Sequence, residues 1–236
     1  MKSLWPIVIC VLLAVDAAAV WFWMESRAEL AIDPLVHEAA MKYHVQPALI
    51  KAVIWKESRF NPDARGLAGE IGLMQIMGDA ASDWSKAENI VPFHHEHLTH
   101  PGSNTMAGTW YLRKALERYT DADNCLPYAL AEYNAGRGNV LRWNKGAAAT
   151  NSRLFIKQID FPGTKSYVLS VMTRYAEYLP EYGISTRSRV AGLIHGNCPH
   201  AAFELFARFL PFLLRNVAPD AQRLADFDVA ASEWQG

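Results

Sequence analysis

The sequence predicts a mainly α-helical protein with little or no β-sheet. Apolar side chains recur every three to four residues around positions 47–59, 104–119 and 164–179. No segment alternates apolar and polar residues with period two over a convincing length, so any sheet is small. The 236 residues are 51% hydrophobic and 20% charged, a globular composition that can bury a sizeable core.

The first predicted element is one N-terminal hydrophobic helix within residues 1–30. Leu4 to Met24 is apolar apart from Asp16, and this length is about that of a membrane-crossing helix. Aromatic residues at 21–23 suit the membrane interface, and Lys2 favours a cytoplasmic N-terminus. The alternative is a cleaved signal peptide, in which the alanines at 17–19 form the small-residue exit. Either route exports the rest of the chain, and the aromatic residues favour the anchor.

The helix predicted from Pro47 ends on an acidic residue within its apolar stripe. Leu49, Val53 and Glu57 stack four residues apart on one face. A carboxylate on the core side is costly to desolvate unless it is hydrogen-bonded, paired or protonated. Glu57 is therefore a candidate general acid. On spacing alone, the alternative is a last-turn carboxylate that tilts to solvent beside its basic neighbours.

Three further helices and a C-terminal extension complete the predicted elements. One helix covers residues 104–119 with Ser103 as a possible cap, and a shorter one starts near Pro127. A third helix begins after Thr164. The extension, residues 183–236, carries an apolar stripe kinked at a proline, which either docks onto the preceding domain or contacts a membrane or partner. Its members are Phe203, Phe206, Phe209, Leu210, Pro211 and Leu213.

Composition and motifs argue against several classes of function. The formal net charge is −1 and the Lys and Arg residues form no long run, so no nucleic acid partner is expected. No Gly-rich phosphate loop or dinucleotide fingerprint is present, and no cofactor is expected. Histidines crowd residues 94–100, but Thr99 stands where a His-Glu-x-x-His motif needs its second histidine, so no metal site is expected. Cys125 and Cys198 could pair in an oxidising periplasm.

Three separated blocks carry a family resemblance. Glu-Ser at 57–58 is followed by Phe-Asn-Pro-Asp-Ala at 60–64, then Gly-Glu-Ile-Gly-Leu-Met-Gln-Ile-Met at 69–77, and much later Ala-Glu-Tyr-Asn-Ala-Gly at 131–136. In this order and spacing they resemble the catalytic domain of the soluble lytic transglycosylases, bacterial enzymes with a goose-lysozyme-like fold that cut peptidoglycan. The resemblance spans about residues 45–179 and implies a lysozyme-like domain.

The resemblance implies a reaction in which Glu57 moves the protons. An apolar surround favours a protonated carboxyl, which donates to the leaving glycosidic oxygen. The resulting carboxylate then acts as base on the C6 hydroxyl of N-acetylmuramic acid, which closes a 1,6-anhydro ring without water. A second protein carboxylate is not required for this chemistry.

The remaining site residues are also carried over from the resemblance. Met74, Gln75 and Met77 are similar to the loop that lines the cleavage site, beside a tight turn at Gly72. For the two methionines, ordinary packing is the alternative. The tyrosine and asparagine of the third block, Tyr133 and Asn134, are similar to a tyrosine that reaches the catalytic carboxyl and its structural neighbour.

Two departures from the family pattern affect the expected site. Gly66 stands where related enzymes often have a serine, which removes a hydrogen bond to the sugar or carboxyl. The run Asp-Phe-Pro-Gly-Thr-Lys at 160–165 replaces a stretch similar to Pro-x-x-Glu-Thr-Arg, which alters a saccharide subsite.

The sequence thus divides into an anchor or signal segment (1–30), a catalytic domain (31–182) and a helical extension (183–236). The leading function is a peptidoglycan lytic transglycosylase held in the inner membrane, with its domain in the periplasm and glycan strands as substrate. A lysozyme-type hydrolase using water and a non-catalytic peptidoglycan-binding or secretion-assembly component are the alternatives.

Overall fold

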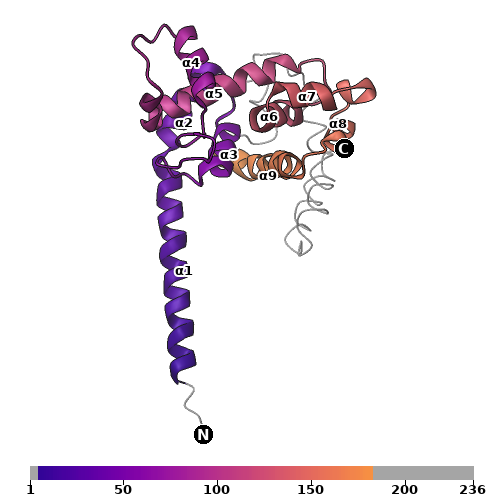
Figure 1. Cartoon of the computed structure of the whole chain (residues 1–236). Coiled ribbons are helices and arrows are strands. Elements are labelled where there is room, and N and C mark those ends of the chain that lie inside the picture. The colour runs from indigo at the N-terminus through magenta and orange to yellow at the C-terminus, as the bar shows by residue number, and fades with distance from the viewer. Residues whose placement is uncertain (1–4, 183–236) are drawn as a thin grey trace, which may run out of the picture. The chain divides into compact units, whose positions relative to one another are not determined.

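The computed structural model describes residues 5–182, which form helices joined by turns (Figure 1). Apart from isolated bridges that pair Arg65 with Ile71 and Ile71 with Ile76, this part of the chain contains no β-structure. The prediction of a mainly α fold with little or no sheet is confirmed. The extension 183–236, with its predicted apolar stripe and Cys198, lies outside the described residues.

The described residues divide into two compact units. The first unit comprises residues 5–114 and 178–182, and the second comprises residues 115–177. Each unit has its own buried side chains and is described by itself below.

The first unit begins with α1 (Trp5–Ala31) and α2 (Asp33–Tyr43). Pro34 lies in the first turn of α2, where its missing N–H costs nothing. Large apolar side chains of α1 are exposed, namely Trp5, Val8, Ile9, Val11, Leu12, Leu13, Val15, Val20, Trp23 and Leu30. Among residues 5–182, no helix combines the length and the apolar character that are needed to cross a membrane.

The central element of this unit is α3 (Pro47–Ser58), whose residues 48–54 are all buried. The predicted start at Pro47 is confirmed. The helix ends where Arg59 and Phe60 adopt left-handed backbone conformations, with φ of 53° and 63°. Such conformations are uncommon outside glycine, and they turn the chain sharply away from the helix axis. The helix stop that the sequence predicts after Glu57 is therefore present.

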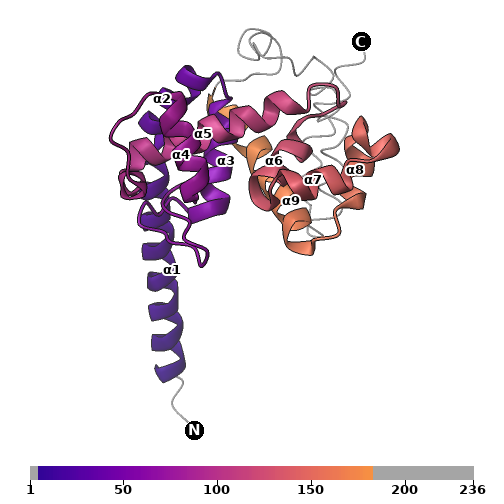
Figure 2. The same cartoon turned by 45° about the horizontal axis from the view of Figure 1, so that its top comes forward.

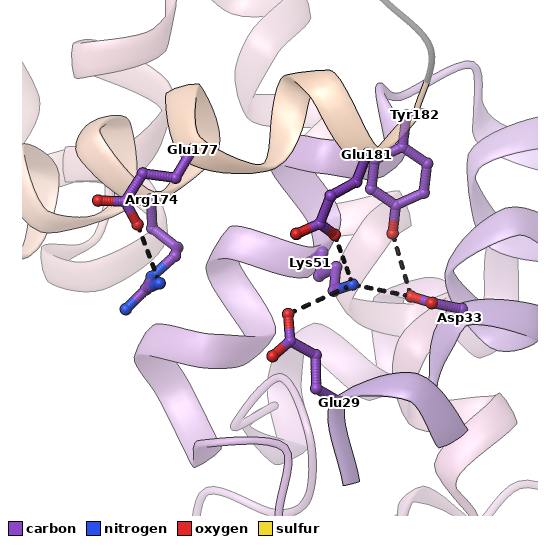
Figure 3. Close-up of polar contacts among 7 residues, drawn as sticks. All are labelled: Glu29, Asp33, Lys51, Arg174, Glu177, Glu181 and Tyr182. Carbon is purple, nitrogen blue, oxygen red and sulfur yellow. Dashed lines mark hydrogen bonds and ion pairs between the residues drawn. The ribbon is translucent and has the colours of Figure 1, made fainter. Parts of the chain in front are cut away.

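A buried lysine of α3 joins three other elements of the first unit, including η3 (Leu179–Tyr182) (Figure 3). The ammonium of Lys51 lies 2.9 Å from Glu181, 3.2 Å from Asp33 and 3.3 Å from Glu29, and its side chain is 3% exposed. The hydroxyl of Tyr182 donates to Asp33 at 3.2 Å. We call these five residues the Lys51 cluster. It fixes the end of α1 and the start of α2 to the helix that carries Glu57.

The rest of the first unit is built from α4 (Gly78–Ala87), η1 (His95–Thr99) and the first part of α5 (Pro101–Arg118). The sequence prediction placed the start of α5 three residues too late. Ser103 lies inside the first turn and is not the cap, because Pro101 takes the first helical position. In the described part of the chain, no group of three or more His, Cys, Asp or Glu side chains could hold a metal ion.

The second unit contains four α-helices and one short 3-10 helix after the end of α5. The α-helices are labelled in Figure 2. Its core is aromatic, because the ring of Tyr128 stacks on Phe155 with centroids 4.0 Å apart and on Tyr119 at 5.4 Å. The helix predicted after Thr164 begins two residues earlier, at Pro162, again because proline suits the first turn. The elements are α6 (Leu126–Ala135), α7 (Arg137–Trp143), η2 (Gly146–Ala149), α8 (Ser152–Gln158) and α9 (Pro162–Tyr178).

Candidate active site

Glu57 lies in the last turn of α3, where the buried stripe of the helix meets the surface. Leu49 and Val53, the residues eight and four positions earlier, are 3% and 0% exposed. Glu57 itself is half-buried. The next residue, Ser58, donates its hydroxyl back to the carbonyl of Ile54 at 3.1 Å. Ser58 thus fixes the helix end beside Glu57.

The chain that follows α3 folds back on the end of that helix. Asn61 N–H donates to Ser58 O at 3.1 Å, and Ala64 N–H donates to Asn61 O at 3.3 Å. Gly72 N–H in turn donates to Ala64 O at 2.8 Å. This series of backbone bonds ties the segment 64–77 to the residue next to Glu57.

A tight turn forms the centre of this segment. Ile71 and Ile76 exchange backbone hydrogen bonds of 3.2 and 3.0 Å, and Gly72 has φ of +77°. The predicted tight turn at Gly72 is confirmed. A Cβ at this position would also lie 2.4 Å from the amide nitrogen of Asn104, so both backbone conformation and space require glycine.

Asn104, a residue that sequence reasoning missed, holds the turn in place. Its fully buried amide donates to Ile71 O at 2.7 Å and to Leu98 O at 3.0 Å, and it accepts from Met74 N–H at 2.8 Å. Three buried backbone groups that have no helical partner are satisfied in this way. The only signal in the sequence is an asparagine on an otherwise apolar face of a helix.

The two methionines of the predicted loop have different surroundings. Met74 is fully buried, and its sulfur accepts a hydrogen bond from Thr109 at 3.9 Å. A Cβ at Gly108 would lie 2.4 Å from that sulfur, so the small residue admits the side chain. This is the placement of a packing residue. Met77 is 45% exposed, and for both residues a role in binding substrate stays a prediction.

Gln75 is half-buried and has an unusual backbone, with φ of +48°. Its amide nitrogen donates to Ala64 O at 3.1 Å and to Gly72 O at 2.9 Å. Both N–H groups of the amide are therefore used to hold the turn. Its carbonyl oxygen is the atom that a ligand could reach.

The other two predicted site residues, Tyr133 and Asn134, lie in the second unit, in the last turn of α6. Tyr133 is half-buried, and Asn134 is exposed. The side-chain oxygen of Asn134 accepts from the hydroxyl of Thr164 at 2.8 Å, which ties the end of α6 to the first turn of α9. In the altered run 160–165, Asp160 accepts from Trp143 at 2.6 Å and from Arg142 at 2.8 Å. The predicted alteration of a saccharide subsite here stays a prediction.

A buried carboxylate next to Tyr133 was also missed from the sequence. Glu132 is 1% exposed and pairs with Arg118 and with the hydroxyl of Tyr119. Burial and the hydrogen bond to Glu132 raise the pKa of Tyr119, so the tyrosine remains a proton donor. The network fixes α6, and therefore the backbone of Tyr133, to the end of α5.

The structure thus groups the predicted site residues by unit. Glu57, Gln75 and Met77 belong to one hydrogen-bonded region of the first unit, with Met74 packed beneath the turn. Such a region offers a half-buried carboxyl as proton donor and an amide oxygen as acceptor. A mainly α fold, a half-buried glutamate at the end of a buried helix and a turn folded back on that end are typical of a lysozyme-like domain.

Comparison with known protein families identifies the family to which the chain belongs. Residues 34–156, just over half of the chain, match the family model described as "Transglycosylase SLT domain". The chain therefore belongs to this family. The region includes Glu57, the turn at Gly72 and the end of α6.

The curated relatives are longer proteins. The soluble lytic murein transglycosylase of Salmonella typhimurium is 30% identical over 167 residues, which cover 70% of this chain and 25% of that protein. The membrane-bound lytic murein transglycosylase C of Photorhabdus laumondii is 34% identical over 116 residues, which cover 46% of this chain and 32% of that protein. The chain thus spans about a quarter to a third of the length of these relatives.

Solved structures support the same fold. The 70 kDa soluble lytic transglycosylase of Escherichia coli is similar with a TM-score of 0.60 and 29% identity, over 72% of this chain and 27% of that one. A complex of the 70-kDa soluble lytic transglycosylase with bulgecin A gives a TM-score of 0.61 at 29% identity, over the same shares of the two chains. The lysozyme-like fold predicted from the sequence is confirmed.

Proposed function

We propose that this protein is a peptidoglycan lytic transglycosylase that cleaves the MurNAc–GlcNAc glycosidic bond and leaves 1,6-anhydro-MurNAc ends. The observation that carries the proposal is Glu57, half-buried at the end of α3, with the turn 71–76 hydrogen-bonded back to that helix end. Membership of the transglycosylase family supports it.

In the proposed reaction, one carboxyl moves both protons. Protonated Glu57 donates to the leaving oxygen as the bond between that oxygen and C1 of MurNAc breaks. The Glu57 carboxylate then accepts the proton of the C6 hydroxyl while O6 bonds to C1. Glu57 is regenerated in its acid form, and no water enters the product. Because the substrate supplies its own nucleophile, a second protein carboxylate is not required.

The supporting roles follow from the surroundings of each side chain. The side-chain oxygen of Gln75 accepts from saccharide hydroxyl or acetamido groups, and Met77 lines the same region with an exposed apolar side chain. Met74 contributes to binding by supporting the turn. In the second unit, Tyr133 and Asn134 are the proposed substrate-binding residues, and Asn134 fixes the helix end that carries Tyr133.

The first test is the variant Glu57→Gln, which keeps the size of the side chain but cannot move a proton. We expect cleavage to fall by at least about two to four orders of magnitude while the fold is preserved. The measurement is mass spectrometry of muropeptides released from purified sacculi. Glu38→Gln, an exposed carboxylate of α2, is the matched control and should retain full activity.

The chemical form of the cleavage products distinguishes a lytic transglycosylase from a lysozyme-type hydrolase. Lytic transglycosylation yields anhydro ends without new reducing ends, whereas a lysozyme-type hydrolase adds one water for each bond that it cleaves and leaves a reducing end. Reducing ends as the main product would favour the hydrolase on the same site. A wild-type protein that binds glycan without cleaving it would favour the non-catalytic component, and near-wild-type activity of Glu57→Gln would refute the assignment of the acid.

We also propose that the N-terminal segment anchors the protein in the inner membrane with its catalytic domain in the periplasm. The relatives include soluble and membrane-bound enzymes. The anchor is supported by the run of apolar residues from Leu4 to Met24 and by the exposed large apolar side chains named above for α1. The guanidinium of Arg27 lies 4.9 Å from the ring centre of exposed Trp23, an arrangement suited to a membrane interface.

A further inference from the structure

Gly66 is a glycine for reasons of space. Its backbone does not lie in the left-handed region, so a residue with a side chain could adopt the same conformation. A Cβ at this position, however, would lie 2.1 Å from the carboxylate oxygen Oε2 of Glu70 and 2.7 Å from its Cδ. A side chain at position 66 therefore requires the Glu70 carboxylate to move from this place.

The Glu70 carboxylate is held over Gly66 by the backbone of the loop. Ala68 N–H donates to Glu70 Oε2 at 2.9 Å, and Gly66 N–H donates to Glu70 O at 2.9 Å. Gly69 N–H closes the loop with a bond of 3.3 Å to Gly66 O. Glu70 is half-buried, so part of its carboxylate remains open to a ligand.

The side-chain oxygen of Gln75 is a second hydrogen-bond acceptor beside Gly66. The side-chain oxygen of Gln75 would lie 3.0 Å from a Cβ at Gly66, and the amide nitrogen of Gln75 is bonded to Ala64 and Gly72. The carboxylate of Glu70 and the amide oxygen of Gln75 thus lie side by side over Gly66. Both oxygens are hydrogen-bond acceptors, and the arrangement suits a ligand that brings hydroxyl or N–H donors.

The pair also lies close to the proposed acid along the chain of backbone bonds. Ala64, which accepts from both Gly72 N–H and the Gln75 amide, is bonded through Asn61 to Ser58, the neighbour of Glu57. A saccharide ring held at the acceptor pair would therefore be held beside the end of α3.

We propose that Glu70 is a substrate-positioning residue whose carboxylate, together with the Gln75 oxygen, accepts hydrogen bonds from hydroxyl or acetamido N–H groups of the bound saccharide. In this chain the carboxylate occupies the place that a side chain at position 66 would take, and Gly66 leaves that place open. The inference rests on the proposed function and names a group that binds the substrate of that same site.

The experiment measures binding separately from cleavage. In the Glu57→Gln background, the affinity for a purified GlcNAc–MurNAc tetrasaccharide is measured by calorimetry. Glu70→Gln keeps an acceptor for Ala68 N–H but removes the charge, and we expect the affinity to fall about tenfold or more. Glu70→Ala should lose at least as much. Asp63→Asn, an exposed carboxylate of the same loop, is the control and should bind like its parent.

A double variant tests the pairing of Gly66 with Glu70. Gly66→Ser alone should lower both the melting temperature and the affinity, because its Cβ meets the Glu70 carboxylate. Adding Glu70→Ala should restore the melting temperature and part of the affinity, since the serine hydroxyl then replaces the acceptor. Equal effects of Gly66→Ser in both backgrounds would refute the pairing.

The outcomes separate this inference from the proposed function. Unchanged affinity in Glu70→Gln and Glu70→Ala, with anhydro products formed by the wild type, overturns the inference alone. An equal loss in Asp63→Asn also overturns it, because the effect would then reflect general loop charge. A wild-type protein that binds the tetrasaccharide in a Glu70-dependent manner but does not cleave glycan overturns the proposed function and supports the inference. Absence of both binding and cleavage overturns both.

Discussion

At the scale of single residues, Asn104 determines the geometry of the turn that follows the helix of Glu57. One buried amide bonds to three backbone groups, and two of its partners, Ile71 and Met74, lie 33 and 30 residues earlier in the chain. Helical periodicity shows only that an asparagine interrupts an apolar face. Its partners could not be read from the sequence, because no local pattern relates residues at such separations.

Replacement of Asn104 by leucine should destabilise the protein by about 2–4 kcal/mol. The variant fills a similar volume but leaves buried backbone groups of the turn without hydrogen bonds, and each such group costs about 1–3 kcal/mol. For a chain of this size the melting temperature should fall by roughly 2–4 °C per kcal/mol, which calorimetry measures. Ser103→Ala, one position earlier, is the control and should stay within about 0.5 kcal/mol of the wild type. A stable Asn104→Leu variant would show that the turn does not depend on this amide.

The positions that were predicted correctly follow from rules that involve only neighbouring residues in the sequence. The position of Glu57 follows from helical spacing, and the tight turn at Gly72 follows from the conformational freedom of glycine. The surroundings of Met74 and Gln75 could not be predicted in the same way. Whether a methionine packs or lines a groove depends on distant residues, here Gly108 and Thr109 on α5.

At the scale of elements, α3 is positioned by the Lys51 cluster. Lysine is almost never fully buried unless it is paired, so its position in the helical repeat does not predict burial. Its partners come from α1, α2 and η3, and Glu181 lies 130 residues away in sequence. Helix starts were predicted within a few residues, and the two errors, at Pro101 and Pro162, arose because proline marks the first turn.

The Lys51 cluster should make stability fall at alkaline pH. Burial alone lowers the pKa of Lys51, but hydrogen bonds to Glu181 and Asp33 outweigh it, so the pKa lies above the unfolded value of 10.5. The folded state then binds more protons than the unfolded state, and stability falls as pH rises from 10.5 through the folded pKa. Below pH 10.5 the full contribution is present. Urea unfolding at several pH values measures this dependence.

Lys51→Met is the comparison that isolates the lysine. Burial also raises the pKa of Tyr119 and Tyr128, and their ionisation lowers stability in the same direction in both proteins. The difference in unfolding free energy between wild type and Lys51→Met should therefore shrink as pH rises beyond 10.5. A difference that stays constant over this range would show that the charge of Lys51 does not stabilise the fold.

At the scale of the whole molecule, the helical class and the family could be predicted, but the division into two units could not. Apolar periodicity and three short motifs indicate one α-rich catalytic domain. Both signals come from residues that are close together in the sequence. The boundary between the units at Lys114 lies inside α5, where the helix continues without interruption. Compactness of a unit depends on contacts between distant segments, such as that of η3 with α3, which the sequence pattern does not reveal.

Under the proposed anchoring, the location of the molecule depends on the N-terminal segment, and Asp16 is the residue that tests it. A lone aspartate near the middle of a spanning helix costs about 2.5 to 3.5 kcal/mol on insertion scales. The aliphatic and aromatic residues on both sides, from Leu4 to Met24, offset this cost. An acid inside the membrane also often marks a contact with a partner. Insertion is therefore expected to tolerate Asp16, and Asp16 is expected to contact a partner within the membrane.

We predict that the mature protein retains residues 1–24, sediments with inner membranes and exposes its catalytic domain to the periplasm. Intact-mass measurement of the native protein and protease treatment of spheroplasts check the two parts of this prediction. Asp16→Leu should remain in the membrane fraction, whereas a second charge, as in Leu12→Arg, should release much of the protein because the two costs add. A mature chain that starts near Val20 or Trp21 would instead show a cleaved signal peptide, and the apolar run would then serve export alone.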